Sequence, residues 1–547
     1  MAPEERLRQE LAAAAQRLGA SADVAPVVER PRDPAFGDWT TNLAMALARQ
    51  LRRKPQEIAH DLIASLDLAA AGVAEATVAG AGFINFRLQA AAAFHGIHEI
   101  LAKPDTYGRF NDGNGESFNV EFVSANPTGP LHVGHGRQAA LGDAIASLLE
   151  SAGWRVMREF YYNDGGVQIT NLALSVQERV RGATTGTYNI PEGGYHGEYI
   201  MDIAERYVAA HPDDANGEQL ETIRRFAVAE LRKEQDLDLQ AFGVQFDTYF
   251  LESSLYVDGM VDETVEMLRA AGHTFEKDGA LWLQTTDYGD DKDRVMRKSD
   301  GTYTYFVPDV AYHVSKWRRG FRHCINVQGA DHHSTVVRVR AGLQAVGIGI
   351  PEGYPEYELH QMVTVTRAGE EVKISKRAGS YVTVRDLVDE VGRDAVRYFF
   401  LMRKADSQLI FDVDLARSQS EENPVYYIQM AHARVSGIFR VGGIDSASVS
   451  STGVDLAALT EESERELGQA LLDFPRLLAG AVSSREPHRV AAYLLETARL
   501  VHNWYHKVRV LEAPPGAREA RLVLARAAQI VLRNGLAILG ISAPERM

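Results

Sequence analysis

Two histidines stand three residues apart, in the order His132, Val133, Gly134, His135. They follow a turn flanked by prolines and precede a long helical pattern, so they fall at a predicted helix N-terminus. That end of a helix carries partial positive charge and unpaired N–H groups, which together bind anions. Gly134 lacks a side chain and would let a flat base or a ribose approach the backbone. The alternative is that the two histidines simply cap the helix.

A second segment whose residues could take part in a reaction is the basic run at 372–379, which reads Val-Lys-Ile-Ser-Lys-Arg-Ala-Gly. Lys373, Lys376 and Arg377 place three cations close together, and Ser375 adds a hydroxyl. Such a loop can fold over a triphosphate and pair its charges with the phosphate oxygens. The alternative is a solvated basic loop, which is the usual interpretation of a charge run.

The elements that must position the histidines form a strand–helix–strand pattern. A strand over 117–123, a helix over about 134–152 and a strand over 155–162 predict a βαβ unit and therefore a parallel sheet. Residues 167–270 are mostly helical in pattern, and we expect the short apolar strands within 273–415 to form the second half of the same sheet. Ligands bind such sheets at the carboxyl ends of the strands.

The flanking regions are predicted to be separate units. Before the sheet we expect helices over 3–22 and about 40–53, the second capped by Asp38 or Thr40, and a strand over 77–88. A polar, turn-rich stretch at 104–115 marks a boundary. From Asn423 onward almost everything is helical in pattern. The predicted domains are 1–110, 111–415 with a helical insertion at about 170–270, and 416–547.

Composition limits the classes of protein that remain. The 547 residues are 45% hydrophobic and 24% charged, which is typical of globular chains. Cys324 is the only cysteine, which excludes an internal disulfide framework and a cysteine-rich zinc site, and which fits a reducing, cytoplasmic compartment. No apolar run reaches the roughly 18 residues that cross a membrane. The net charge of −16 argues against a generally basic binder of DNA.

Taken together, the two segments resemble the motif pair of the class I aminoacyl-tRNA synthetases, HIGH and KMSKR. Here they read HVGH at 132–135 and KISKR at 373–377, in the same order and about 240 residues apart. Each departs from the family motif at one apolar position. The predicted parallel sheet is also the fold of that class.

Longer stretches are similar to the arginyl-tRNA synthetase family and cover essentially the whole chain. They are 82–86, 121–132, 162–169, 242–247, 300–309, 329–333, 423–429, 486–506 and 543–547. The resemblance implies an α/β protein with a Rossmann-type catalytic domain, a small α/β N-terminal domain that binds tRNA, and an all-α C-terminal domain that binds the anticodon. It implies ATP-dependent ligation of L-arginine to its tRNA through arginyl-adenylate.

The resemblance also implies the substrates and the residues of the site. Mg²⁺ is expected to arrive with ATP, no zinc is expected because no His/Cys cluster has zinc spacing, and a monomer is expected. A guanidinium needs acidic, planar partners. The implied catalytic residues are His132, His135, Lys373, Ser375 and Lys376; ATP contacts are Asn126, Gly129, His132, Gly134, His135, His332, Lys373 and Lys376; arginine contacts are Glu121, Asn126, Tyr305, Asp309 and Gln328; tRNA contacts are Tyr426, Tyr427, Trp504, Lys507 and Arg509.

Several alternatives stay open at this point. Glu121 could be a surface carboxylate, Asp309 could cap a helix over 310–317, and Tyr427 and Trp504 could belong to a helical core. A cysteinyl enzyme is a rival, but the single cysteine counts against its cysteine-bound zinc. A nucleotidylyltransferase would not need the long helical region after KISKR. A non-catalytic paralogue that only holds tRNA would have no physical need to keep both motifs.

Overall fold

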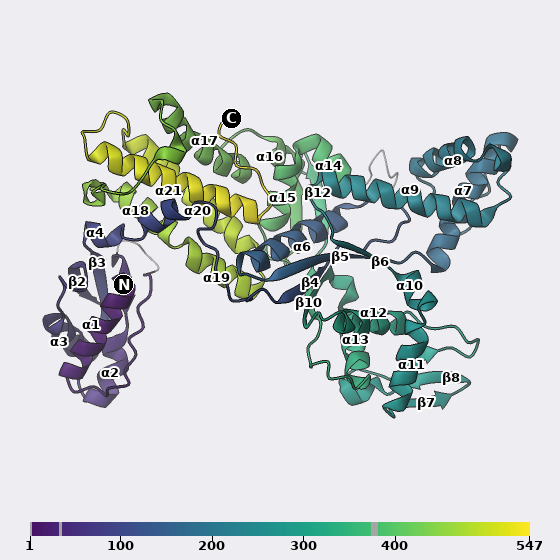
Figure 1. Ribbon diagram of the computed structural model, residues 1–547, viewed down its shortest axis with the longest axis horizontal. Helices are drawn as coiled ribbons and strands as arrows, with labels where there is room; N and C mark the ends of the chain where they lie inside the picture. Colours follow the sequence, from purple (N-terminus) through teal and green to yellow (C-terminus); the bar gives the residue numbers. More distant parts are fainter. Residues whose placement is uncertain (1–2, 32–35, 373–380) are drawn as a thin grey trace.

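The computed structural model describes residues 3–31, 36–372 and 381–547. Figure 1 shows an elongated molecule: the N-terminal unit and the C-terminal helices lie towards one end, the inserted helices within 166–241 lie at the other, and the central sheet lies between them. Within the described residues, no helix combines the length and the apolar character that crossing a membrane requires.

The central sheet is parallel, with strand order β11-β10-β4-β5-β6. Its strands are β4 (Ser117–Glu121), β5 (Arg155–Tyr162), β6 (Thr248–Leu251), β10 (His323–Gly329) and β11 (Glu356–His360). From β4 the chain builds outward through β5 and β6, and it then returns to the other side of β4 with β10. The order therefore reverses between β4 and β10, and ligands of such sheets bind at the carboxyl ends beside that point.

Helices cover both faces of this sheet. Helix α6 (Val133–Ser151) lies on one face, and α12 (Phe306–Arg318) with α13 (His333–Ala345) lies on the other (Figure 1). Because side chains alternate along a strand, Phe118 and Val120 join the core on the α6 side, whereas Asn119 and Glu121 face α12. Helix α6 packs closely: a Cβ at Gly142 would lie 2.2 Å from the Phe122 side chain.

The prediction of one sheet over 273–415 is right for β10 and β11 and wrong for the other strands. An antiparallel sheet has the order β7-β8-β9, and another has the order β13-β12-β14. Their bounds are β7 (Thr274–Lys277), β8 (Ala280–Leu283), β9 (Arg294–Arg297), β12 (Val363–Arg367), β13 (Glu370–Glu371) and β14 (Leu409–Asp412). A strand pattern predicts pairing but not the partner, so short apolar runs alone could not assign these strands to a sheet.

The helical insertion is interrupted. Its helices are α7 (Gly166–Thr185), α8 (Glu198–Ala210), α9 (Leu220–Ala241), α10 (Glu252–Val257) and α11 (Met260–Ala270). Strand β6 lies between α9 and α10 and joins the edge of the central sheet, so the prediction of a mostly helical pattern over 167–270 missed the strand at 248–251. Four residues are too few to show a clear strand period within a helical surrounding.

The N-terminal unit is a small sheet, ordered β1-β3-β2, with helices packed on it. Its elements are α1 (Pro3–Arg17), β1 (Trp39–Thr41), α2 (Leu43–Leu51), α3 (Pro55–Ser65), β2 (Val73–Ala79), β3 (Phe83–Leu88), α4 (Ala90–Ala93) and α5 (Ile97–Ala102). The predicted strand at 77–88 is a hairpin, because Gly80 and Gly82 take positive φ of 54° and 124° and turn the chain.

Two further N-terminal predictions are corrected by the structure. The first helix ends at Arg17, and the second begins at Leu43, after a strand rather than after a cap. Neither Asp38 nor Thr40 caps that helix. The buried Asp38 carboxylate instead accepts the backbone N–H of Leu88 and pairs with Arg465, which ties this unit to helix α18 (Glu462–Leu472).

The C-terminal region is helical, as predicted. Its elements and those leading into it are α14 (Val384–Val391), α15 (Arg393–Leu401), α16 (Val413–Arg417), α17 (Pro424–Gly442), α19 (Phe474–Ser484), α20 (His488–Lys507) and α21 (Ala517–Ile538). The Arg397 guanidinium is buried and joins three elements: it pairs with Asp143 of α6 at 2.5 Å and donates to the Leu539 carbonyl at 2.8 Å just after α21. The helices therefore pack directly on the sheet-bearing part of the chain.

Candidate active site

His132 is the N-cap of α6, so the capping interpretation is correct for this residue. Its Nδ1 accepts the backbone N–H of Gly134 at 3.0 Å and that of His135 at 3.3 Å. Because Nδ1 is an acceptor, the proton of the neutral ring must sit on Nε2. The cap therefore leaves Nε2–H as a donor for a ligand.

The two imidazoles stack, with ring centroids 3.6 Å apart and planes 21° apart. Burial lowers the pKa of His132. Burial, together with His132 and His360, lowers the pKa of His135 well below its usual value. Near pH 7 both rings are neutral, so they offer hydrogen bonds rather than full positive charge. A Cβ at Gly134 would lie 2.8 Å from the His132 ring. The lack of a side chain at Gly134 therefore makes room for the His132 ring, before it makes room for any ligand.

A cavity of about 530 Å³ opens in front of the histidines. It brings together four of the residues predicted for ATP, and it adds residues that sequence reasoning missed. The predicted ones are Asn126, Gly129, His132 and His135; the added ones include Gln168, Tyr195, His196, Tyr199 and Tyr381. Gly134 and His332 are not among the described residues that line it. Tyr195 and His196 come from the connection between α7 and α8, where no periodicity marks them.

The loop at 126–130 is held in place by distant side chains. The Asn126 amide donates to the Gln168 side chain at 2.6 Å. The Tyr199 hydroxyl donates to the Thr128 carbonyl and the Tyr381 hydroxyl to the Pro130 carbonyl, both at 2.9 Å. The helical insertion and the segment after the basic run therefore shape the same wall of the cavity.

The predicted catalytic residues Lys373, Ser375 and Lys376 lie outside the described residues. The chain that follows them is joined to the histidine motif. The Val133 N–H donates to the Val382 carbonyl at 3.1 Å, and the Val384 N–H donates to the Leu131 carbonyl at 2.9 Å. Thr383 begins α14 with a capping box, so this junction is fixed on both sides.

A second group of side chains is acidic. Glu121 ends β4 and is buried, so it is not a surface carboxylate. Asp309 lies in the first turn of α12 but does not cap it, because the helix begins at Phe306 and its N-cap is Tyr305. Burial, Glu252 and Glu121 together raise the pKa of Asp309 to about 8. Three carboxyl groups from β4, α10 and α12 thus share one electrostatic environment.

The other predicted arginine contacts differ in exposure. Tyr305 is 71% exposed, four residues before Asp309. Gln328 is the penultimate residue of β10, which pairs with β4, and its buried Oε1 has no hydrogen-bond partner among the described residues. Sequence reasoning missed Glu252, which accepts the Tyr161 hydroxyl at 2.8 Å. Glu252 and Ser253 also match the arginyl-tRNA synthetase family, but Glu252 has no periodic signal of its own.

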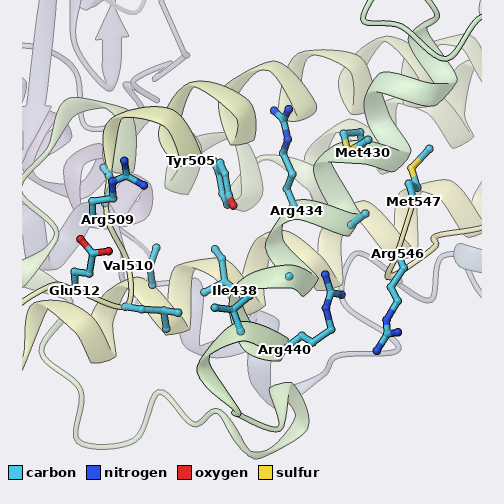
Figure 2. A pocket seen from close by; sticks show the side chains of 15 residues that line it. Met430, Arg434, Ile438, Arg440, Tyr505, Arg509, Val510, Glu512, Arg546 and Met547 are labelled. Carbon is cyan, nitrogen blue, oxygen red and sulfur yellow. The ribbon is translucent and has the colours of Figure 1, made fainter.

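The residues predicted to contact tRNA separate into exposed and buried ones. Arg509 and the exposed Tyr505 line a cavity of about 340 Å³ with three more arginines (Figure 2): Arg434, Arg440 and Arg546. Lys507 is exposed near it, and Tyr426 lines a different cavity with Arg393 and Arg417.

Trp504 is fully buried in the helical core, so the prediction that it contacts tRNA is wrong and the core alternative is right. Helical spacing cannot tell a core aromatic from an exposed one when its neighbours are mixed. Tyr427 is half-buried and stacks on His502, with ring centroids 4.2 Å apart. Its ring therefore packs mainly between α17 and α20.

Within the described part of the chain, no cluster of three or more His, Cys, Asp or Glu residues is arranged to hold a metal ion. The described residues of the site present neutral imidazoles and carboxyl groups, and in the sequence a basic run precedes Tyr381. This combination can hold a phosphorylated ligand at one end and a cationic group at the other.

Comparisons with known proteins cover the full chain. Three family models match: "Arginyl tRNA synthetase N terminal domain" at 5–88, "tRNA synthetases class I (R), catalytic domain" at 96–414, and "DALR anticodon binding domain" at 428–547. The arginine–tRNA ligase of Thiobacillus denitrificans is 54% identical over 545 residues, 98% of this chain and 97% of that protein. That of Janthinobacterium sp. (strain Marseille) is 52% identical over all of both chains. The solved arginyl-tRNA synthetase of Thermus thermophilus is 26% identical, covers all of both chains and superposes with a TM-score of 0.74.

Proposed function

Since the chain belongs to the arginyl-tRNA synthetase family, we propose that its histidine cavity and its acidic site form one active centre. The protein is an arginine–tRNA ligase whose substrates are arginine, ATP and tRNA. In the proposed arrangement the cavity at His132 and His135 takes the nucleotide, and Glu121 with Asp309 takes the guanidinium. The observation that carries this arrangement is the capped His132 ring, which keeps one N–H donor for the cavity.

In the first step the arginine carboxylate attacks the α-phosphorus of ATP. The new P–O bond forms as the bond to the bridging oxygen breaks, and pyrophosphate leaves with both electrons of that bond. Neutral His132 donates from Nε2 to a phosphate oxygen, which gains charge in the transition state. We assign to Lys373, Ser375 and Lys376 the stabilisation of the leaving pyrophosphate, and Mg²⁺ enters bound to ATP.

In the second step a ribose hydroxyl of the terminal adenosine attacks the acyl carbonyl of the adenylate. The ester bond forms, AMP leaves, and the hydroxyl proton is released. No covalent enzyme intermediate is needed, so catalysis consists of positioning and charge stabilisation. Asn126 and Gly129 shape the wall between the two ligands, since both line the cavity and Asn126 follows the strand that carries Glu121.

Arginine selection is proposed to rest on charge. A guanidinium is planar and always charged, and it is stabilised best by carboxylates in fixed positions. Glu121, Asp309 and the neighbouring Glu252 supply these, with Tyr305 and Gln328 as polar neighbours. Burial beside Glu252 and Glu121 raises the pKa of Asp309, and the positive charge of a bound guanidinium would offset this effect.

The tRNA is proposed to contact both ends of the chain. The arginine-lined cavity of Figure 2 offers phosphate contacts through Arg509, with the exposed Lys507 nearby in the chain. Tyr426 would contact the tRNA from the second cavity, which it lines with Arg393 and Arg417. The proposed domains remain 1–110, 111–415 and 416–547. We also propose a monomer that works in the cytoplasm, where translation consumes charged tRNA.

The test is aminoacylation of total bacterial tRNA with each of twenty labelled amino acids, ATP and Mg²⁺. Charging with arginine alone is expected. His135→Ala and Glu121→Gln should then separate the two halves of the centre: the first lowers kcat for ATP–pyrophosphate exchange, and the second raises the KM for arginine. If either variant affects neither parameter while the protein stays folded, its assigned site is wrong.

A further inference from the structure

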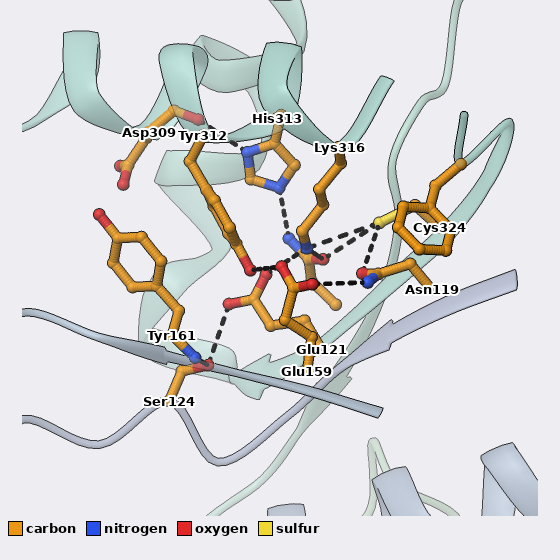
Figure 3. A network of polar contacts seen from close by, with 12 residues as sticks. Asn119, Glu121, Ser124, Glu159, Tyr161, Asp309, Tyr312, His313, Lys316 and Cys324 are labelled. Atoms are coloured by element: carbon orange, nitrogen blue, oxygen red, sulfur yellow. Dashed lines mark hydrogen bonds and ion pairs between the residues drawn. The ribbon is translucent and has the colours of Figure 1, made fainter. Parts of the chain in front are cut away.

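A row of polar side chains crosses the central sheet where its topology reverses. In the parallel register, Glu121 of β4 lies beside Asn326 of β10 on one side and Glu159 of β5 on the other. All three residues are buried, and Glu121 and Glu159 face α12 (Figure 3). Asn326 faces the same helix, because its side chain contacts Lys316 and His313. A sheet face normally buries apolar groups against a helix, so this row needs polar partners from α12.

Lys316 of α12 supplies the main one. Its side chain is fully buried, and its ammonium donates to Glu121 Oε2 at 2.6 Å, to Asn326 Oδ1 at 3.2 Å and to Cys324 Sγ at 3.6 Å. The Nζ atom also lies 4.4 Å from the centre of the Tyr312 ring. All three of its N–H donors are therefore used. Burying an ion pair is costly and seldom stabilises a fold, so its presence here favours a role in the site.

The contacts continue from Lys316 to Asp309. The Asn326 amide meets His313 Nε2 at 2.7 Å, and His313 Nδ1 meets the Asp309 carbonyl at 2.7 Å. Burial lowers the pKa of His313 to about 4, so its ring is neutral with one proton. That proton must sit on Nδ1, because a carbonyl only accepts. Asn326 must then donate to Nε2, which leaves Oδ1 to accept from Lys316.

The second buried carboxylate, Glu159, receives its hydrogen bonds from residues outside this chain of contacts. Glu159 accepts two hydrogen bonds from Arg319, at 2.7 Å and 2.8 Å, and others from Tyr312 at 2.7 Å and Asn119 at 3.1 Å. Arg319 therefore serves Glu159, while Lys316 serves Glu121. The two ion pairs come from one helix and contact adjacent strands, which makes each a control for the other.

We propose that Lys316 is a positioning residue for arginine, which holds the Glu121 carboxylate in a fixed place relative to Asp309 through the chain of hydrogen bonds that ends at the Asp309 backbone. It can act this way only if Glu121 and Asp309 bind arginine, as proposed above. One Glu121 oxygen is held by Lys316 and the other accepts the Ser124 hydroxyl at 3.0 Å, so the carboxylate cannot turn freely. The guanidinium then binds a carboxylate that is already in position, so arginine binding does not have to order the site.

The spacing on α12 supports this assignment. Asp309, Tyr312, His313 and Lys316 recur at intervals of three and four residues, so they share one face of the helix. That face carries Asp309, whose carboxylate is proposed to bind the substrate, near the N-terminal end of the helix. The buried ammonium of Lys316 lies two turns later. A displacement of α12 would therefore move both parts of the arginine site together.

The experiment is a double-mutant cycle on the full-length enzyme, read by ATP–pyrophosphate exchange with tRNA present. Lys316→Met removes the ammonium but keeps an unbranched side chain, and it should raise the KM for arginine about tenfold or more while the KM for ATP stays unchanged. Glu121→Gln should also raise it. In the double variant Lys316→Met should add little, because its effect passes through Glu121. Arg319→Met, which breaks the neighbouring ion pair, should leave the KM for arginine unchanged.

His313→Leu is the second variant, because it breaks the chain without leaving a charge buried. It should raise the KM for arginine as well, which keeps the test decisive if Lys316→Met does not fold. The proposal is overturned if Glu121→Gln raises that KM but Lys316→Met and His313→Leu do not. The proposal is also overturned if the two substitutions raise the KM for arginine multiplicatively in the double variant. It is overturned likewise if Arg319→Met raises that KM as much as Lys316→Met does. No effect of Glu121→Gln would instead remove the proposed arginine site itself.

Discussion

The two nitrogens of the His132 imidazole have different roles, one in the fold and one in the cavity. Nδ1 caps α6, while Nε2 is left with the proton. An asparagine at this position would keep a cap acceptor but lose the imidazole donor, and an alanine would lose both. These two variants therefore separate what the residue does for the helix from what it does for the reaction.

We predict that His132→Asn and His132→Ala both lower the rate of ATP–pyrophosphate exchange, by about 10²–10³-fold, because each removes a donor to the phosphate. Only the alanine variant should also lose stability, by about 1 kcal/mol, because only it loses the cap. Exchange kinetics and urea denaturation measure the two effects. Near-normal exchange in His132→Asn would mean that the ring serves the helix alone.

Asp309 allows a prediction about pH. With a pKa of about 8, its carboxyl group is mostly protonated at pH 7 before arginine binds. A bound guanidinium stabilises the ionised form, so arginine binding should lower this pKa and release a proton. Affinity for arginine should therefore rise as pH rises from 6 to 8 and level off above it. Calorimetry of arginine binding at pH 7, in buffers of different ionisation enthalpy, counts the protons released.

The matched variant is Asp309→Asn, which has no proton to release at this position. It should bind arginine more weakly, and its binding heat should not depend on the buffer. Equal proton release in both proteins would place the proton on another group and contradict the role of Asp309.

At the scale of elements, the approach of α6 to the sheet decides where the histidines lie. Gly142 permits it, because a Cβ there would lie 2.2 Å from the Phe122 side chain, which follows β4. Gly480 in α19 is the natural comparison, since it is also helical and a Cβ there would meet nothing within 4 Å. The same substitution should therefore have opposite effects in the two helices.

We predict that Gly142→Ala lowers the free energy of unfolding by about 1–3 kcal/mol, because it overpacks the contact between α6 and the sheet. Gly480→Ala should raise it by about 0.5–1 kcal/mol, because alanine is the better helix former. Thermal denaturation of the two variants tests this. Gly142→Ala should also lose activity, as α6 carries His132; equal stability of both variants would show that the sheet yields to the added methyl group.

At the scale of the whole molecule, the arginine-lined cavity of Figure 2 lies in the C-terminal helices, far along the chain from the histidines. Phosphate contacts contribute to nucleic-acid affinity through counterion release, so they are sensitive to salt. Arg509 lines this cavity, whereas Arg499 on α20 is paired with Glu496 and does not. The two residues give a matched pair of charge removals.

We predict that Arg509→Ala raises the KM for tRNA and reduces the slope of log affinity against log salt by about one, while the KM for arginine stays unchanged. Arg499→Ala should change both quantities less. Aminoacylation kinetics between low and moderate salt measure the slope. Identical slopes in the two variants would exclude a phosphate contact at Arg509.

The sequence by itself determined the class of protein, the βαβ core and four of the residues that line the cavity at the histidines. HVGH lies on a helix N-terminus because a turn and a regular apolar pattern define that helix locally. Strand β5 and helix α6 were predicted within a residue because their periods are long and uninterrupted. Glu121 and Asp309 were found by resemblance to the arginyl-tRNA synthetase family, since neither residue carries a local signal.

Only the tertiary structure decided which strands share a sheet and which polar side chains share a site. Lys316 contacts Glu121 across 195 positions of the chain. The two meet because α12 leads into β10, the neighbour of β4, and packs on the face of the sheet to which Glu121 points. Trp504 is buried because of how helices pack, which its own spacing does not specify. Local patterns encode local conformation, whereas these contacts depend on which surfaces the folded chain brings together.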